Sequence, residues 1–144
     1  MTGEDGSASL EFITIGMILL LPLVYLVIAL SSLQAAAFAA EGAARQASRV
    51  FVQAEDKDAA QAAATRAVEF ALLDYGLERA AVDTGLSCEP EPRDCLRRRG
   101  TVTVTVRILV PMPLVPPMLD LSVPLSVPIE SSSTQTVPRF RGDG

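Results

Sequence analysis

The sequence has no histidine, no tryptophan and only two cysteines among its 144 residues. The absence of histidine excludes catalytic triads that depend on an imidazole, and it removes most zinc sites. The remaining carboxylates and hydroxyls fall into no recognisable catalytic motif. We therefore expect a protein that is not an enzyme and that holds no metal or cofactor.

Excess positive charge is also lacking, because the formal net charge is −5. A nucleic-acid-binding protein usually presents a basic face, so nucleic acid is not expected as a partner. The length allows one soluble domain at most beside a membrane-like segment.

Charged side chains are absent from Phe12 to Ala40. The strongly apolar part, Phe12 to Leu33, is long enough for a helix that crosses ~30 Å of hydrocarbon, which takes ~20 residues. It is apolar on every side, whereas the core helix of a globular protein is usually shorter and amphipathic. Pro22 is tolerable inside a membrane helix through a local kink. The segment predicts one transmembrane helix with membrane lipid as its surroundings.

A secretory signal peptide and an ordinary single-pass anchor also stay open for this segment. A signal peptide has a basic start and a shorter apolar run, whereas the leader "MTGEDG" carries no Lys or Arg. Ala37-Phe38-Ala39 could still serve as its cleavage site. Neither the signal peptide nor the plain anchor accounts for the glutamate that opens the run.

Glu11 stands at the start of the apolar run, after the small residues of "GSAS". A carboxylate suits the positive end of a helix dipole, but it needs a partner if it is drawn deeper into the membrane. Cleavage after Gly6 would give Ser7 an ammonium group. In a bundle of parallel helices, Glu11 of one subunit can pair with Ser7 of the next, which would fix their axial register.

Gly6, four small or apolar residues, Glu11-Phe12 and a long apolar helix together resemble the processing site of type IV prepilins. Within that group the chain is most similar to TadE-like minor pseudopilins of tight-adherence (Flp-type, type IVb) pili, over about Gly6 to Phe51. The resemblance implies cleavage after Gly6 by a membrane prepilin peptidase. It also implies a structural role in assembly, with other pilins or pseudopilins and the pilus assembly platform as partners. The acidic leader departs from the family, whose leaders usually carry a basic residue.

Signals for membrane orientation conflict. Arg45 and Arg49 follow the span, and the positive-inside rule for short loops would leave them in the cytoplasm. Longer domains translocate largely regardless of charge, and a cysteine pair favours an oxidising, exported side. The resemblance implies the same side. We expect a single-pass protein of the cytoplasmic (inner) membrane with an exported C-terminal domain, either in a pilus or in the assembly platform.

Gln34 to Ala81 is rich in alanine and free of proline, which favours helix. We expect the first helix to run unbroken from about Ser9 to Val52. A second helix follows the charged break "EDKD", capped by Asp56 or Asp58 and stopped at Gly76. Apolar positions at helical spacing mark one stripe on each helix: Ala47, Val50, Phe51 and Ala54, and then Ala64, Val68, Ala71, Leu72 and Tyr75. Packing of the small-residue stripe against the second helix is favoured over packing between subunits.

Cys88 and Cys95 enclose a loop of prolines and charges, which predicts a surface loop closed by a disulfide. A redox or metal pair is disfavoured because there is no Cys-x-x-Cys and no histidine. The "RRRG" that begins at Arg97 predicts a solvated turn. Contact with anionic lipid or an acidic partner is its alternative.

Thr and Val alternate from Thr101 to Val110, which predicts a strand with one apolar face. A proline-rich connection follows; we expect its apolar residues to fill the core rather than to rest on the membrane or on a neighbour. These residues are Leu114, Val115, Met118 and Leu119. "LSVPLSVPIESSSTQTV" returns as a second strand. Two strands are marginal alone, so the sheet must lean on the second helix, another strand or a partner subunit.

The expected fold is therefore α+β: a long N-terminal transmembrane helix continuing into an Ala-rich helical region, then a small antiparallel hairpin or sheet with a proline-rich connection. The chain divides into a leader (1–6), a transmembrane helix and stalk (7–52) and an exported domain (53–144). Two functions stay open. The protein is either an assembly subunit or a membrane-anchored envelope protein whose exported domain binds a ligand or surface. Cleavage after Gly6 distinguishes them.

Overall fold

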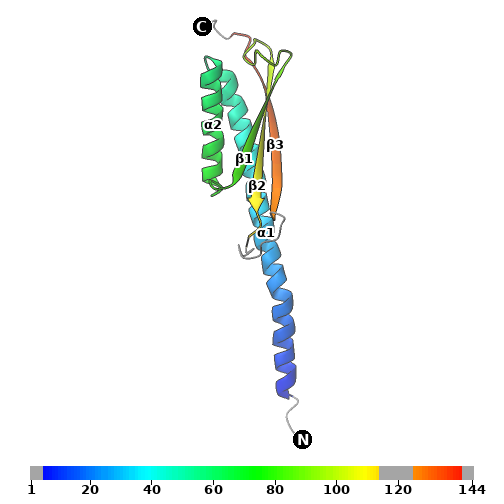
Figure 1. Cartoon of the computed structure of the whole chain (residues 1–144). Helices are drawn as coiled ribbons and strands as arrows, with labels where there is room; N and C mark the ends of the chain where they lie inside the picture. Colours follow the sequence, from blue (N-terminus) through cyan, green and yellow to red (C-terminus); the bar gives the residue numbers. More distant parts are fainter. Residues whose placement is uncertain (1–4, 114–124, 141–144) are drawn as a thin grey trace.

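A computed structural model describes residues 5–113 and 125–140 of the chain. The elements follow in the order α1 (Asp5–Gln53), α2 (Lys57–Asp74), β1 (Ala81–Glu89), β2 (Thr101–Pro111) and β3 (Ser126–Thr136). The C-terminal half of α1 lies beside α2 and the sheet, and its N-terminal half projects alone (Figure 1). We call α2, the sheet and the part of α1 from Ala29 onward the head. The fold is α+β with a long N-terminal helix, as expected.

Helix α1 runs without a break over 49 residues and is therefore about 73 Å long at 1.5 Å per residue. Pro22 lies inside the helix without dividing it. The hydroxyls of Thr14 and Ser32 donate to the carbonyl oxygens of Leu10 and Ala29, at 2.8 Å each. These polar groups are thus satisfied within the helix, as apolar surroundings require. The prediction of one unbroken N-terminal helix is confirmed.

Helix α2 is capped at both ends by residues that its sequence supplies. Asp56 is the N-cap, and its side chain accepts a hydrogen bond from the Ala59 amide at 2.8 Å. At the other end Gly76 has a φ of 67°. The Leu77 amide donates to the Leu72 carbonyl at 2.8 Å, and the Gly76 amide donates to the Leu73 carbonyl at 3.0 Å. This is a Schellman motif, which favours glycine at that position. The predicted stop at Gly76 is confirmed, and Asp56 rather than Asp58 is the cap.

The sheet is an antiparallel meander with β2 in the centre. The predicted pairing of β2 with the returning strand is confirmed, with Ile108 opposite Ile129. Strand β1 was not predicted, because Ala81, Asp83 and Gly85 within it favour no strand. It pairs with the other edge of β2, with Thr84 opposite Val106. The sheet therefore gains a third strand from this chain. The proline-rich connection with Leu114, Val115, Met118 and Leu119 lies outside the described residues.

The core lies where α1 passes between α2 and the sheet. Helix α1 contributes fully buried small side chains, and β2 contributes the apolar face of its alternating pattern. These residues are Ala36, Ala39, Ala40, Ala43, Ala44 and Ala47 from α1, and Val102, Val104, Val106, Ile108 and Val110 from β2. Of the stripe predicted on α1, Ala47 and Phe51 are buried and Ala54 packs against the core, so this stripe packs within the chain. It packs against the sheet as well as α2, which the sequence pattern did not predict.

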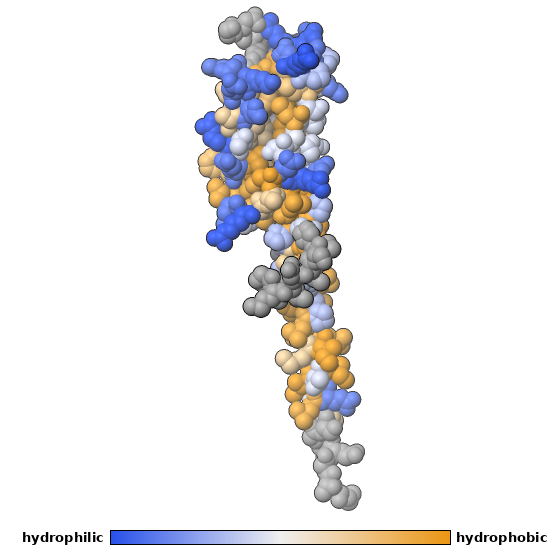
Figure 2. All heavy atoms as spheres, in the orientation of Figure 1, coloured by the Kyte–Doolittle hydropathy of each residue, from blue (hydrophilic) through white to orange (hydrophobic). Residues whose placement is uncertain are grey.

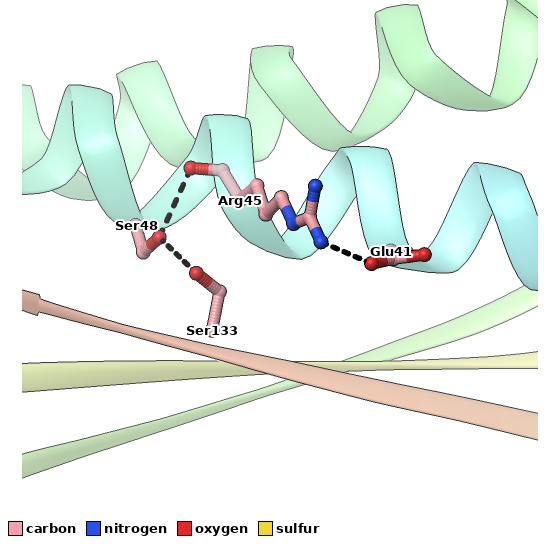
Figure 3. A network of polar contacts seen from close by, with 4 residues as sticks. All are labelled: Glu41, Arg45, Ser48 and Ser133. Atoms are coloured by element: carbon pink, nitrogen blue, oxygen red, sulfur yellow. Dashed lines mark hydrogen bonds and ion pairs between the residues drawn. The ribbon is translucent and has the colours of Figure 1, made fainter.

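Ser48 is a fully buried polar residue in this contact region. Its hydroxyl donates to the Arg45 carbonyl oxygen and is hydrogen-bonded to the Ser133 hydroxyl of β3, at 3.0 Å each (Figure 3). The Arg45 side chain pairs with Glu41 one turn earlier on the helix. Satisfying Ser48 matters because a buried hydroxyl without a partner costs about 1–3 kcal/mol. This contact ties α1 to the edge strand β3.

We predict that a larger side chain in the alanine contact region destabilises the head. Ala40→Leu should lower the free energy of unfolding by about 1–3 kcal/mol, because the close packing leaves no room for three more carbons. Ala37→Leu is the matched control, because Ala37 is exposed on the same helix. Its effect should stay within about 0.5 kcal/mol. Pulse proteolysis in increasing urea, on protein held in detergent, measures both. Equal stability of the two variants would contradict the packing described.

Candidate functional site

The N-terminal part of α1 stands free of the other elements that the structure describes. Every side chain from Ala8 to Ile28 is exposed, and we call this stretch the bare segment. Most of its side chains are large and apolar, such as Phe12 at 79% exposure and Leu19 at 66%. Figure 2 shows the resulting apolar surface on the projecting helix. An apolar surface of this size marks contact with a membrane or a partner. Within the described residues, one helix is long and apolar enough to cross a membrane, and it is α1.

The head covers the upper end of the predicted span Phe12 to Leu33. Ala29 is only 8% exposed, and Leu33 packs against the core. The part of α1 that is apolar and exposed on every side therefore ends at Ile28, whereas Leu30 and Phe38 beyond it remain 48% and 61% exposed on other faces of the helix. Sequence composition could not locate this boundary, because a core and a bilayer select the same apolar residues.

Glu11 is the one charged residue of the bare segment. It is exposed, and Ser7 lies four residues before it on the same helix. Residues at this spacing share a helix face, and helical side chains lean toward the N-terminus. An ammonium group at Ser7 would therefore be in reach of the Glu11 carboxylate of its own chain, and not only of a neighbour's. This second pairing was not predicted from the sequence, although the spacing itself was the signal.

The predicted cleavage site lies in the first turn of α1. The helix begins at Asp5, so the peptide bond between Gly6 and Ser7 belongs to its N-terminal turn. The first four amides of a helix have no partner within the helix. Opening this turn for a peptidase therefore disrupts few backbone hydrogen bonds. Phe12, the remaining residue of the predicted processing motif, lies on the bare segment beside Glu11.

A disulfide joins Cys88, near the end of β1, to Cys95 in the loop that follows. The two Cα atoms are 5.1 Å apart, and both side chains are buried. The predicted pairing is confirmed. The loop lies at the end of the head farthest from the bare segment, which we call the distal end (Figure 1).

Three exposed arginines, Arg97 to Arg99, form a turn at the distal end. Arg99 has a φ of 63°, and its amide donates to the Val137 carbonyl at 3.2 Å. The Val137 amide in turn donates to the Gly100 carbonyl at 2.8 Å. Gly100 is required here, because a Cβ would lie 2.9 Å from the Arg97 carbonyl oxygen. The predicted solvated turn is confirmed, and nothing in the structure tests the alternative, contact with anionic lipid or an acidic partner.

The head also has a shallow groove of about 600 Å³ between α1 and α2. Its lining is mostly apolar and includes Val50, Ala67, Phe70 and Tyr75. Among the residues that the structure describes, no cluster of His, Cys, Asp or Glu could hold a metal ion. The chemically distinctive feature of the chain is therefore the bare segment with its single carboxylate.

Comparison of the chain with family models, curated proteins and solved structures finds no match. A functional assignment therefore depends on the residues and geometry of this chain itself.

We predict that the disulfide stabilises the head by about 2–3 kcal/mol, because it closes a short loop in the unfolded chain. The double variant Cys88→Ala/Cys95→Ala should show this loss in urea and should still enter the membrane, because the bare segment is unchanged. In unreduced, unfolded wild-type protein from the cell envelope, both thiols should resist alkylation. Alkylation of both would contradict the bridge.

Proposed function

We propose that the protein is a membrane-anchored structural subunit, a minor pseudopilin of the TadE-like kind that helps assemble a tight-adherence pilus or related secretion filament. One observation carries the proposal: a single continuous helix is bare and apolar in its first half and built into the head in its second half. A bilayer can hold the bare segment. The same segment can pack beside equivalent helices of other subunits, where dispersion contacts and hydrogen bonds drive association.

The proposed role of Glu11 is to pair with the Ser7 ammonium after the leader 1–6 is removed. A carboxylate close to hydrocarbon is costly unless it is paired. Pairing between chains would set the axial register of helices that otherwise offer uniform apolar surfaces, as single polar residues do in coiled coils. Pairing within one chain would neutralise the charge but set no register. Assembly therefore requires the pairing between chains.

The proposed location is the cytoplasmic membrane, with the leader in the cytoplasm and the head exported. The disulfide between Cys88 and Cys95 supports an oxidising compartment for the head, because such bonds are rare in the cytosol. Arg45 and Arg49 oppose this orientation only by the rule for short loops, and the head is too long for that rule to decide.

The arginine turn at the distal end favours a second candidate, a membrane-anchored envelope protein whose exported domain binds an acidic ligand or surface. Arginine presents a planar fork of donors suited to carboxylates and phosphates. This candidate needs the bare segment as an anchor but needs neither cleavage after Gly6 nor the charge of Glu11.

We predict that the protein from cells with a prepilin peptidase begins at Ser7, and that the protein from cells without the enzyme keeps its leader. Intact-mass measurement of membrane-extracted protein shows the difference. Gly6→Val should block cleavage by crowding the site. Gly3→Val, the matched leader glycine, should be cut normally. A mature chain that begins at Ala40 would instead establish a signal peptide, and an uncut chain in both strains would favour the second candidate.

We also predict that Glu11→Gln abolishes association with the other pilus components at an unchanged membrane level. Removing one partner of a charge pair in a low-dielectric setting costs about 3–5 kcal/mol. Crosslinking and co-purification measure association, and immunoblotting of membranes measures abundance. Glu41→Gln is the control, because Glu41 pairs with Arg45 in the head.

Normal assembly of Glu11→Gln would contradict pairing between chains and leave Glu11 as a favourable residue of the first turns. Loss of the variant from the membrane would show that Glu11 acts in insertion or folding instead.

A further inference from the structure

The part of α1 that is exposed on every side is short for a bilayer. Ala29 is the first buried residue of the helix, while Leu30 on another face stays 48% exposed. Only Phe12 to Ile28 can therefore face lipid on every side. At 1.5 Å per residue they rise about 25 Å. The hydrocarbon core is ~30 Å thick, and any tilt of the helix shortens its rise further. Lipid thinning, burial of Glu11 or entry of the lower end of the head into the interface can close this gap.

The lower end of the head lies where β2 ends and β3 begins, beside α1 (Figure 1). The Met112 amide donates to the Leu125 carbonyl at 3.0 Å and joins the two strands there. The β2 and β3 side chains of this end are apolar and incompletely covered, whereas the exposed Glu78 and Arg79 precede the start of β1 on the other side of β2. Leu109 is 38% exposed and Leu125 is 44% exposed, Pro111 is exposed, and Met112 is half-buried. We call these four residues the lipid-facing edge.

The charge pattern of the strands changes toward this edge. Ile108 to Pro113 and Leu125 to Ile129 carry no charged side chain. The next charged residues on the two strands, Arg107 and Glu130, lie opposite each other in the register. The distal end of β2 differs, because the three arginines of the "RRRG" turn precede it. The β2–β3 pair is thus uncharged at the end nearest the bare segment, and a charged turn precedes β2 at the other end.

We propose that the lipid-facing edge is seated in the interfacial layer of the bilayer that holds the bare segment, with lipid as its partner. The inference relies on the membrane span of α1 in the proposed function. Lipid is favoured over a protein because the bare segment sets the height of this edge in every copy of the chain. Moving exposed apolar side chains from water into this layer is favourable, because it removes apolar surface from water. Burying Glu11 in hydrocarbon is unfavourable.

Seating this edge has two consequences for the protein. Glu11 stays near the opposite interface, at the level where the ammonium group of Ser7 can pair with it. The head also becomes fixed in tilt and rotation, because it touches the membrane at the β2–β3 end as well as at α1.

Single tryptophans test the proposal cleanly, because the chain has none of its own. Three full-length variants are placed in phosphatidylcholine vesicles: Met112→Trp, Ile18→Trp and Phe140→Trp. The acyl chains carry bromine, which quenches tryptophan fluorescence, at either a shallow or a deep position. Met112→Trp should emit at short wavelength and be quenched most by shallow bromine. Ile18→Trp, in the bare segment, should be quenched most by deep bromine. Phe140→Trp, which replaces an exposed side chain near the C-terminal end of the head, should not be quenched.

Each outcome supports or overturns the contact of this edge with lipid. Quenching of Ile18→Trp without quenching of Met112→Trp overturns the inference and leaves the membrane anchor intact. This holds even if Met112→Trp emits at short wavelength, because protein rather than lipid then covers the tryptophan. Lack of quenching at Ile18 overturns the membrane span itself and thus the proposed function. Leu125→Trp repeats the measurement from β3, so that a packing defect specific to Met112→Trp cannot decide the result.

Discussion

One unbroken helix carries two kinds of surface in this protein. The hydrogen bonds of α1 run from Asp5 to Gln53, so the projecting half and the half in the head form one rod. The size of the side chains, rather than a bend in the helix, distinguishes the projecting half of α1 from the half in the head. Below Ala29 the helix presents large apolar side chains on all sides, and above it a stripe of alanines faces α2 and the sheet. The head and the bare segment therefore cannot move independently while the helix stays intact.

The rest of the head follows from that alanine stripe. Small side chains let α2 and the sheet approach α1 closely, and the buried valines of β2 fill the space against it. Asp56 caps the start of α2 and Gly76 ends the helix, so that the chain can turn there and enter β1. The disulfide and the arginine turn lie far from this contact region and add constraint at the distal end. Tertiary packing, more than helix propensity, holds the second half of α1 in place.

Much of this architecture follows from sequence patterns, and the exceptions have physical causes. The strict Thr/Val alternation of β2 and the capping residues of α2 each allow one structure. Strand β1 is different, because Ala81, Asp83 and Gly85 favour no strand. The residues between them, Val82, Thr84 and Leu86, alternate only weakly, and the strand becomes stable through its pairing with β2. At the candidate site, Glu11 and the long apolar run were evident. The start of the head at Ala29 was not, because burial there depends on elements distant in sequence.

Accessibility along α1 in a bilayer tests whether one helix passes directly from lipid into the head. Spin labels placed singly from Phe12 to Phe51, in nanodiscs, report collisions with oxygen and with a water-soluble nickel complex. Uniform access to oxygen and none to nickel should extend to Ile28. From Ala36 onward, access to both should fall with a helical period on the alanine face. A helical period of protection already present between Phe12 and Ile28, or access to nickel throughout that stretch, would contradict this arrangement.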